Sequence, residues 1–132
     1  LGLVQLKKLS VANEQRKLLV EKYIKLLNGT NGISIPFLGI KNIVSAYHIF
    51  PILLGIGIDR LEIIERMKQD GIQTSIHYPC FKDFTAFKGL NLNEAHIAED
   101  IAGRELTLPL YPTMTIKEVE LVVNSIKNSL GI

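Results

Sequence analysis

The 132-residue chain has one cysteine, Cys80, and no tryptophan. A single cysteine cannot form an internal disulfide framework, and it suits a reducing compartment. No apolar run approaches the roughly 18 residues that a membrane-spanning helix needs, and the first residues lack the pattern of a signal peptide. We therefore expect a soluble, cytoplasmic protein with no membrane partner.

Neither sign of charge dominates the sequence. Fifteen basic and thirteen acidic residues give a net charge of +2, and the longest basic block is the pair Lys7 and Lys8. This distribution lacks the basic stripe that nucleic-acid binding requires, so we expect no nucleic-acid partner. The length suits one domain that buries about two thirds of its unfolded surface, and we expect residues 1–132 to form a single domain.

The first 27 residues have the periodicity of an amphipathic helix. Apolar side chains recur three or four positions apart at Leu6, Leu9, Ala12, Leu19, Tyr23 and Leu26. The predicted helix covers about residues 3–27 and ends at Asn28-Gly29. It is long for a small domain and begins without a methionine or a capping residue. We therefore expect the chain to be a fragment of a longer protein.

The compact remainder, about residues 33–132, alternates between strand and helix patterns. Residues 29–42 form a connector with a short extended piece, and strands are predicted at 45–54, at 72–78 and from Glu105 to Pro109. Helices are predicted from Asp59 to Gly71, over 93–102 until Gly103, and after a Thr115/Glu118 capping box. The order predicts an α/β (α+β) fold in which helices cover one face of a small three-stranded sheet.

The predicted strand at 72–78 has one wholly polar face. Its apolar face carries Ile72, Thr74 and Ile76, whereas Gln73, Ser75 and His77 point the other way. A solvated sheet face and a recognition edge both fit this pattern. With Tyr78 and Lys82 just beyond, the donors suit hydroxyl-rich or phosphorylated ligands.

Other chemistries are poorly supported by the sequence. A structural zinc site needs four compact Cys or His ligands, and no C-x-x-C or H-x-x-x-H pair is present, so no metal site is expected. No carboxylate is placed to orient a Cys80/His77 nucleophilic pair, and Cys80 is interpreted as a small half-buried hydrophobe. The glycine-rich run Gly55–Asp59 lacks a complete phosphate-binding motif. We interpret His48 as a partly buried core residue on a strand, and His96 as a helix residue on a solvated or partly packed face.

Four segments resemble, in order and spacing, the C-terminal part of the DegT/StrS-type sugar aminotransferases. They are "LGLVQLKKLSVANEQRKLLVEKYIKLL", "SAYHIFPILL", "DRLEIIERMKQDGIQTSIHYPCF" and "RELTLPLYPTMTIKEVELVV". The most specific elements are "DGIQTSIHYP" and "LPLYPTMT" with the capped helix that follows. The resemblance covers nearly the whole chain.

The resemblance implies that the chain is a C-terminal fragment of a larger enzyme, the small domain of a fold-type I enzyme that uses pyridoxal phosphate. It also implies that the helix over about residues 3–27 bridges the large and small domains. In that family a lysine of a large N-terminal domain holds the cofactor, and most members transfer an amino group from an amino-acid donor to a nucleotide-linked keto-sugar. No lysine here lies in the Schiff-base motif, so this chain alone should be inactive and should not bind pyridoxal phosphate. The parent is expected to be a homodimer that makes amino sugars for surface polysaccharide or a glycosylated product.

The resemblance also implies substrate-binding residues. The family's histidine-tyrosine-proline motif matches His77, Tyr78 and Pro79, at the rim of the active site. Lys82 stands where many members have a second histidine, and Cys80 stands where proline is frequent. Arg60 matches an arginine that we interpret as structural.

One alternative comes from a different class of protein. A free-standing α/β module that binds a metabolite, or regulates through it, at the His77 face would use the same elements, with the first helix serving for dimerisation.

Overall fold

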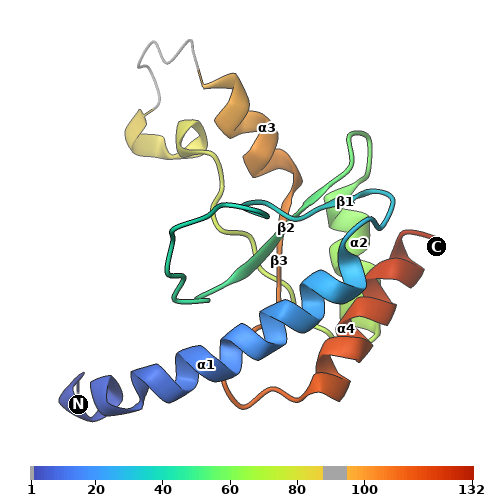
Figure 1. The fold of residues 1–132 in the computed structure, drawn as a ribbon. Helices are drawn as coiled ribbons and strands as arrows, with labels where there is room; N and C mark the ends of the chain where they lie inside the picture. The colour runs from blue at the N-terminus through green and yellow to red at the C-terminus, as the bar shows by residue number, and fades with distance from the viewer. Residues whose placement is uncertain (1, 88–94) are drawn as a thin grey trace.

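The computed structural model describes residues 2–87 and 95–132 as an α+β fold (Figure 1). In chain order, the described elements are α1 (Gly2–Leu27), β1 (Ile33–Ser34), β2 (Phe50–Leu54), α2 (Arg60–Gln69), the 3-10 turns η1 (Phe81–Asp83) and η2 (Thr85–Phe87), α3 (His96–Arg104), β3 (Glu105–Leu108) and α4 (Ile116–Ser129). The predicted three-stranded sheet with helices is confirmed. None of the helices in these two ranges is long and apolar enough to span a bilayer.

The sheet has the strand order β1-β2-β3, and both neighbouring pairs are antiparallel. Its third strand is β1, which lies in the expected connector, and not the predicted strand at 72–78. That segment joins β3 only through an isolated bridge, in which Ser75 and Thr107 exchange two backbone hydrogen bonds of 3.1 and 2.8 Å. The predicted alternation is real, because Ile72, Thr74 and Ile76 are all half-buried. Alternation records which side chains face the protein, and it does not require a continuous hydrogen-bonded ladder.

The hydrophobic core lies between one face of the sheet and the helices α1, α2 and α4. Alternate residues of β2 are buried, and they meet Leu106 and Leu108 from β3. The buried hydrophobic residues from the helices and the loop before α4 are Leu19, Val20, Tyr23, Leu27, Ile63, Met67, Met114, Val119, Val122, Val123 and Ile126. By contrast, α3 has no buried residue and leads directly into the first residue of β3 (Figure 1).

Only the second half of α1 packs into this core. Tyr23 is fully buried, stacks on Phe50 with ring centroids 4.6 Å apart, and donates a 2.8 Å hydrogen bond to the carbonyl of Pro109. Burial raises the pKa of the Tyr23 phenol well above its ordinary value, and the nearby Tyr111 adds to the shift. The predicted core positions Leu6 and Leu9 are instead exposed, because the first turns of α1 extend past the sheet (Figure 1).

The boundaries of α2 and α3 partly follow the predictions. The Asp59 carboxylate caps α2 by accepting from the backbone N–H groups of Leu61 and Glu62, and Gly71 follows the helix with a left-handed φ of 78°. Asp59 and Glu62 have the spacing of a capping box, but among the described residues the Glu62 carboxylate pairs with Arg66 and makes no contact with the Asp59 backbone. The sequence spaces Leu61, Ile64 and Met67 as one apolar stripe, but Leu61 is 70% exposed and Ile63 is buried.

Gly103 does not end α3, contrary to the prediction. The helix continues to Arg104, whose guanidinium pairs with Asp100 one turn earlier, at 2.9 Å from Nε, and donates to the Leu54 carbonyl at 2.7 Å. These contacts stabilise the last helical turn. The predicted start at Asn93 lies outside the described residues.

The predicted capping box of α4 is confirmed. Thr115 Oγ1 accepts from the Glu118 N–H at 3.2 Å, and the Glu118 carboxylate accepts from the Thr115 N–H at 2.6 Å. These bonds satisfy backbone donors that a helix start otherwise leaves without partners. They also set the direction in which α4 leaves the loop after β3.

Replacing Thr115 with alanine removes the side-chain cap of α4. We expect Thr115→Ala to lower the free energy of unfolding by about 1 kcal/mol, measured by urea denaturation. Thr113→Ala is the matched control, because Thr113 is exposed and lies in the preceding turn. Equal stabilities for the two variants would show that the cap does not stabilise the domain.

The capping box also makes stability depend on pH. Hydrogen bonds from the Thr115 backbone and side chain, then from Tyr111, hold the pKa of Glu118 below its ordinary value of 4.5. The folded chain therefore binds fewer protons than the unfolded chain in mild acid. The stabilisation is complete above the ordinary glutamate pKa and is lost as the pH falls through the lower pKa of the folded state. We expect Glu118→Gln to unfold with a weaker acid dependence than the wild type, and parallel urea midpoints against pH would contradict this.

Candidate functional site

The site begins with two buried polar side chains on β3. Alternation along the strand turns Leu106 and Leu108 toward the helices, and therefore turns Glu105 and Thr107 toward the opposite face. Both are nevertheless buried, with only 4% and 5% of their surface exposed. A buried carboxylate without hydrogen-bond partners would cost several kcal/mol, so this face of β3 requires donors from elsewhere in the chain.

His77 supplies one of these donors and contacts the other polar residue. Its backbone N–H donates to Glu105 Oε2 at 2.8 Å, and its Nδ1 lies 3.0 Å from Thr107 Oγ1. The Thr107 hydroxyl in turn donates to Glu105 Oε1. We call these three residues the Glu105–Thr107–His77 network. Together with the Ser75–Thr107 bridge, this network holds the segment before Pro79 against β3.

Tyr78 lies next to this network but on the surface. It is 71% exposed, the peptide bond from His77 to Tyr78 is cis, and the two rings meet edge to face with centroids 5.1 Å apart. The predicted pair thus combines a half-buried imidazole with an exposed phenol, an arrangement that presents both rings at one edge of the domain.

A small cavity of about 160 Å³ adjoins His77 and also includes His48. His48 is exposed and precedes β2, so its interpretation as a partly buried strand residue was wrong. The antiparallel register explains its position. Phe50 pairs with Leu108, so the residues before Phe50 run beside those after Leu108, and Leu110 lines the same cavity. That register, which pairs Phe50 with a residue 58 positions later, was not available from the sequence.

Lys82 is not brought into this cavity. Its ammonium group lies 2.7 Å from the Glu99 carboxylate of α3, and this hydrogen bond holds the pKa of Glu99 below its ordinary value. Arg60, the first residue of α2, donates to the carbonyls of Ala102 and Glu105, the latter at 3.0 Å, and so fastens α2 to the end of α3 and the start of β3. This contact fits the structural role expected for Arg60. Cys80 lines a separate cavity of about 280 Å³ beside Arg60.

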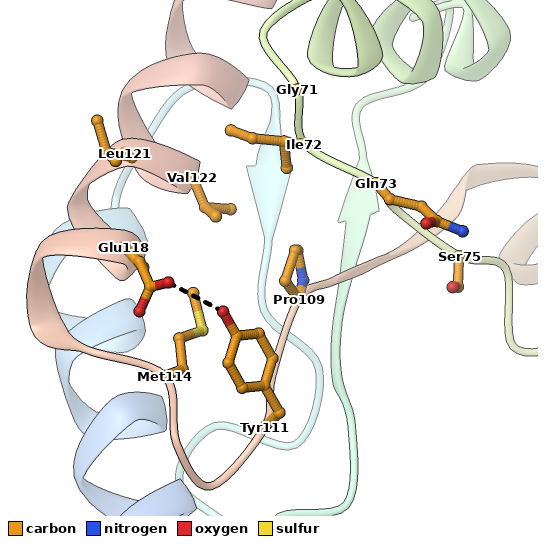
Figure 2. A pocket seen from close by; sticks show the side chains of 10 residues that line it. All are labelled: Gly71, Ile72, Gln73, Ser75, Pro109, Tyr111, Met114, Glu118, Leu121 and Val122. Carbon is orange, nitrogen blue, oxygen red and sulfur yellow. Dashed lines mark hydrogen bonds between the residues drawn. The ribbon is translucent and has the colours of Figure 1, made fainter.

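A larger cavity of about 410 Å³ lies between the 71–75 segment, the loop after β3 and α4 (Figure 2). The Tyr111 hydroxyl donates to Glu118 Oε1 at 3.1 Å, and desolvation followed by Glu118 raises the pKa of this phenol. Figure 2 shows Gln73 and Ser75 pointing away from the Tyr111/Glu118 pair. Gln73, Ser75 and Pro109 line both cavities, so the two hollows are neighbours.

The described residues do not fit pyridoxal phosphate or a metal ion. A Schiff base needs a lysine amine in the site, yet no lysine lines either the 160 Å³ or the 410 Å³ cavity. Within residues 2–87 and 95–132, no three His, Cys, Asp or Glu side chains gather closely enough to bind a metal. This surface can therefore position a ligand through hydrogen bonds, and it has no means of forming the cofactor's covalent link.

Comparison with known proteins agrees with the fold and the arrangement of these segments. Over 136 residues the chain is 35% identical to a dTDP-4-amino-4,6-dideoxy-D-glucose transaminase of Escherichia coli, covering 98% of this chain and 36% of that protein. A sugar aminotransferase structure from Streptococcus pneumoniae in its PMP form matches with a TM-score of 0.86 and 26% identity, over 97% of this chain and 33% of that one. The aminotransferase TlmJ of Streptoalloteichus hindustanus shares the fold, with a TM-score of 0.88 at 23% identity, over 98% of this chain and 35% of that one.

The chain thus spans about a third of the length of the relatives it matches. The family model for the DegT/DnrJ/EryC1/StrS aminotransferases matches residues 1–127, nearly the whole sequence. The resemblance inferred from the four sequence segments is confirmed. This chain belongs to the DegT/DnrJ/EryC1/StrS aminotransferase family.

Proposed function

We propose that this chain is the C-terminal small domain of a pyridoxal-phosphate-dependent sugar aminotransferase. The parent enzyme transfers an amino group from an amino-acid donor to a nucleotide-linked keto-sugar. The name of the Escherichia coli relative, a transaminase of a dTDP-linked amino sugar, supports this class of substrate. When bound to the parent, the cofactor supplies the electron sink for amino transfer, and this chain supplies part of the surface that holds the sugar nucleotide.

The observation that carries the proposal is the Glu105–Thr107–His77 network. Two buried side chains of β3 hold the imidazole through backbone and ring contacts, so His77 is oriented before any ligand arrives. Preorganised polar groups at the edge of a cavity are typical of ligand sites. Tyr78 extends this rim as an exposed phenol.

In this proposal Lys82 also belongs to the rim. Its ammonium group leaves the Glu99 carboxylate and pairs with a phosphate of the ligand. Its present partner Glu99 lies on the surface of α3, where an ion pair contributes little to stability. A phosphate of the nucleotide would be a comparable or better partner for the ammonium group. Such a contact requires the Lys82 ammonium group to leave the Glu99 carboxylate.

The exposed turns of α1 support a division of this chain into two parts. Residues 3–27 form the bridging helix and residues 33–132 the compact part of the domain. Exposed apolar residues gather on the first turns of α1, namely Leu3, Val4, Leu6, Leu9 and Val11. Such a surface suits contact with a preceding catalytic domain of about 250 residues, the upper end of the usual domain size. The parent is proposed to be a cytoplasmic homodimer in amino-sugar biosynthesis.

Adding pyridoxal phosphate to this chain tests the division of labour. We expect no absorbance of a stoichiometric internal aldimine and no lysine adduct after borohydride reduction, read by mass spectrometry. The longer gene product that contains the preceding domain should show both. A single reducible lysine adduct on this chain would overturn the proposal. Tight binding of an unmodified metabolite by this chain alone would favour the free-standing module.

Replacing His77 with alanine tests its place at the rim. The Thr107 hydroxyl keeps its Glu105 acceptor and the backbone N–H at position 77 is retained. We therefore expect His77→Ala to cost at most about 1 kcal/mol of stability but to weaken the use of nucleotide sugar by the parent at least tenfold in kcat/KM. His96→Ala is the control, because His96 lies on the solvent-exposed side of α3. If His77→Ala unfolds the chain, the residue is structural and the assignment fails.

A further inference from the structure

The Thr107 hydroxyl lies between two groups and has one proton to give. It is within hydrogen-bond distance of Glu105 Oε1 on one side and of His77 Nδ1 on the other. A carboxylate can only accept hydrogen bonds, whereas a hydroxyl donates one and accepts others. The proton of Thr107 is therefore committed to Glu105.

This commitment determines which nitrogen of His77 carries the ring proton. Since Thr107 Oγ1 has no second proton, it can meet Nδ1 at 3.0 Å only as an acceptor, and Nδ1 must donate. The other oxygen of Glu105 accepts from the His77 backbone N–H at 2.8 Å, so the carboxylate is held from both sides. In the neutral ring the remaining nitrogen, Nε2, is then an acceptor.

We propose that Glu105 and Thr107 are positioning residues that hold His77 as its Nδ1–H tautomer, so that Nε2 accepts a hydrogen bond from a sugar hydroxyl group of the ligand. The inference deepens the function proposed above and rests on it for the identity of the ligand. Glu105 is 4% exposed and acts only through Thr107 and His77. The group that meets the ligand is the imidazole.

The size and lining of the cavity favour a hydroxyl-bearing edge of the ligand. Its volume of about 160 Å³ is well below the roughly 300 Å³ at which pockets enclose whole small molecules. Besides His77, the lining includes His48, Ser75 and Gln73, whose groups can donate or accept. No lysine or arginine lines it, so a hydroxyl group suits this cavity better than a phosphate group.

The tautomer can be measured on this chain without substrate or cofactor. The sequence has three histidines, so long-range proton–nitrogen spectra at about pH 8, above the ordinary range of histidine titration, can resolve each ring. Variants at His48 and His96 assign the signals. We expect His77 to show a protonated Nδ1 and a bare Nε2. A protonated Nε2 in the wild-type chain overturns the proposal.

A matched pair of substitutions tests the role of Thr107. Thr107→Val keeps the shape of the side chain but removes the hydroxyl group, whereas Thr107→Ser restores it. We expect the valine variant to lose the pure Nδ1–H signature and the serine variant to retain it. Thermal unfolding of both variants checks that the fold persists. If Thr107→Val unfolds, Glu105→Gln replaces it. The amide keeps one acceptor oxygen, and when that oxygen accepts from the His77 backbone N–H, its NH2 group faces Thr107 and frees the hydroxyl proton to donate to Nδ1. The same tautomer readout then applies.

Kinetics of the longer gene product connect the tautomer with the ligand. With a dTDP-linked keto-sugar as the probe, we expect Thr107→Val to raise KM about tenfold while kcat changes less than about twofold, and Thr107→Ser to recover most of the loss. A purely structural role would lower the amount of folded enzyme and leave KM unchanged. An unchanged KM in a folded Thr107→Val enzyme that has lost the tautomer contradicts the proposal.

Different results would contradict the proposed function and the positioning role of Glu105 and Thr107. A wild-type parent that binds pyridoxal phosphate but does not use nucleotide-linked keto-sugars would defeat the proposed function, and with it the choice of ligand. The tautomer measurement stands apart from that result, because it needs only this chain. A protonated Nε2 in a fully active parent would defeat the positioning role alone.

Discussion

The burial of a carboxylate on the non-core face of β3 is the constraint on which the site depends. Glu105 is almost completely removed from solvent, and an unpaired charge there would cost more than one side chain of the hydrophobic core contributes. The chain meets this demand with one backbone N–H and one hydroxyl, both from residues of the site. The groups that satisfy the carboxylate are therefore the same groups that orient the candidate ligand-binding imidazole.

The same end of β3 is also held by α2, and the neighbouring strand β2 is held by α3. Arg60 donates to the carbonyl of Glu105, and Arg104 donates to the carbonyl of Leu54. Each guanidinium joins a helix to the sheet through backbone acceptors, which do not depend on a partner's ionisation. Glu105 is thus fixed at its backbone by one arginine and at its carboxylate by the 77–107 contacts. Rigid support on both sides is what a positioned imidazole requires.

The fold could be predicted from the sequence where local signals carry it. The Thr115/Glu118 capping box and the Gly71 stop each depend on residues within a few positions of one another. Two predictions were wrong, namely a full strand at 72–78 and a partly buried His48. Both features depend on which strands pair across the sheet. A two-residue strand such as β1 has no periodicity of its own to detect, so it competes poorly with a longer alternating segment.

The candidate site shows the same limit more sharply. His77 and Tyr78 could be identified from a polar face and from resemblance to a family, but Glu105 looked like an ordinary charged residue at the start of a strand. Only the structure shows that alternation places it in the interior beside Thr107. One signal was present: "ELTL" carries a charged and a hydroxyl residue two positions apart, on the side of a strand opposite two leucines. A polar pair on one face of an otherwise buried strand predicts a partner that satisfies it.

The exposed half of α1 and the occupied face of β3 point to a division between binding and chemistry. The hydrogen-bonding groups of the site are held by the fold of this chain alone, whereas no lysine lines the two cavities beside His77. A surface that is rigid and polar but lacks a reactive amine can select and orient a ligand. The first turns of α1 carry exposed apolar side chains away from the core, and surfaces of this kind are typical of contacts with other parts of a protein.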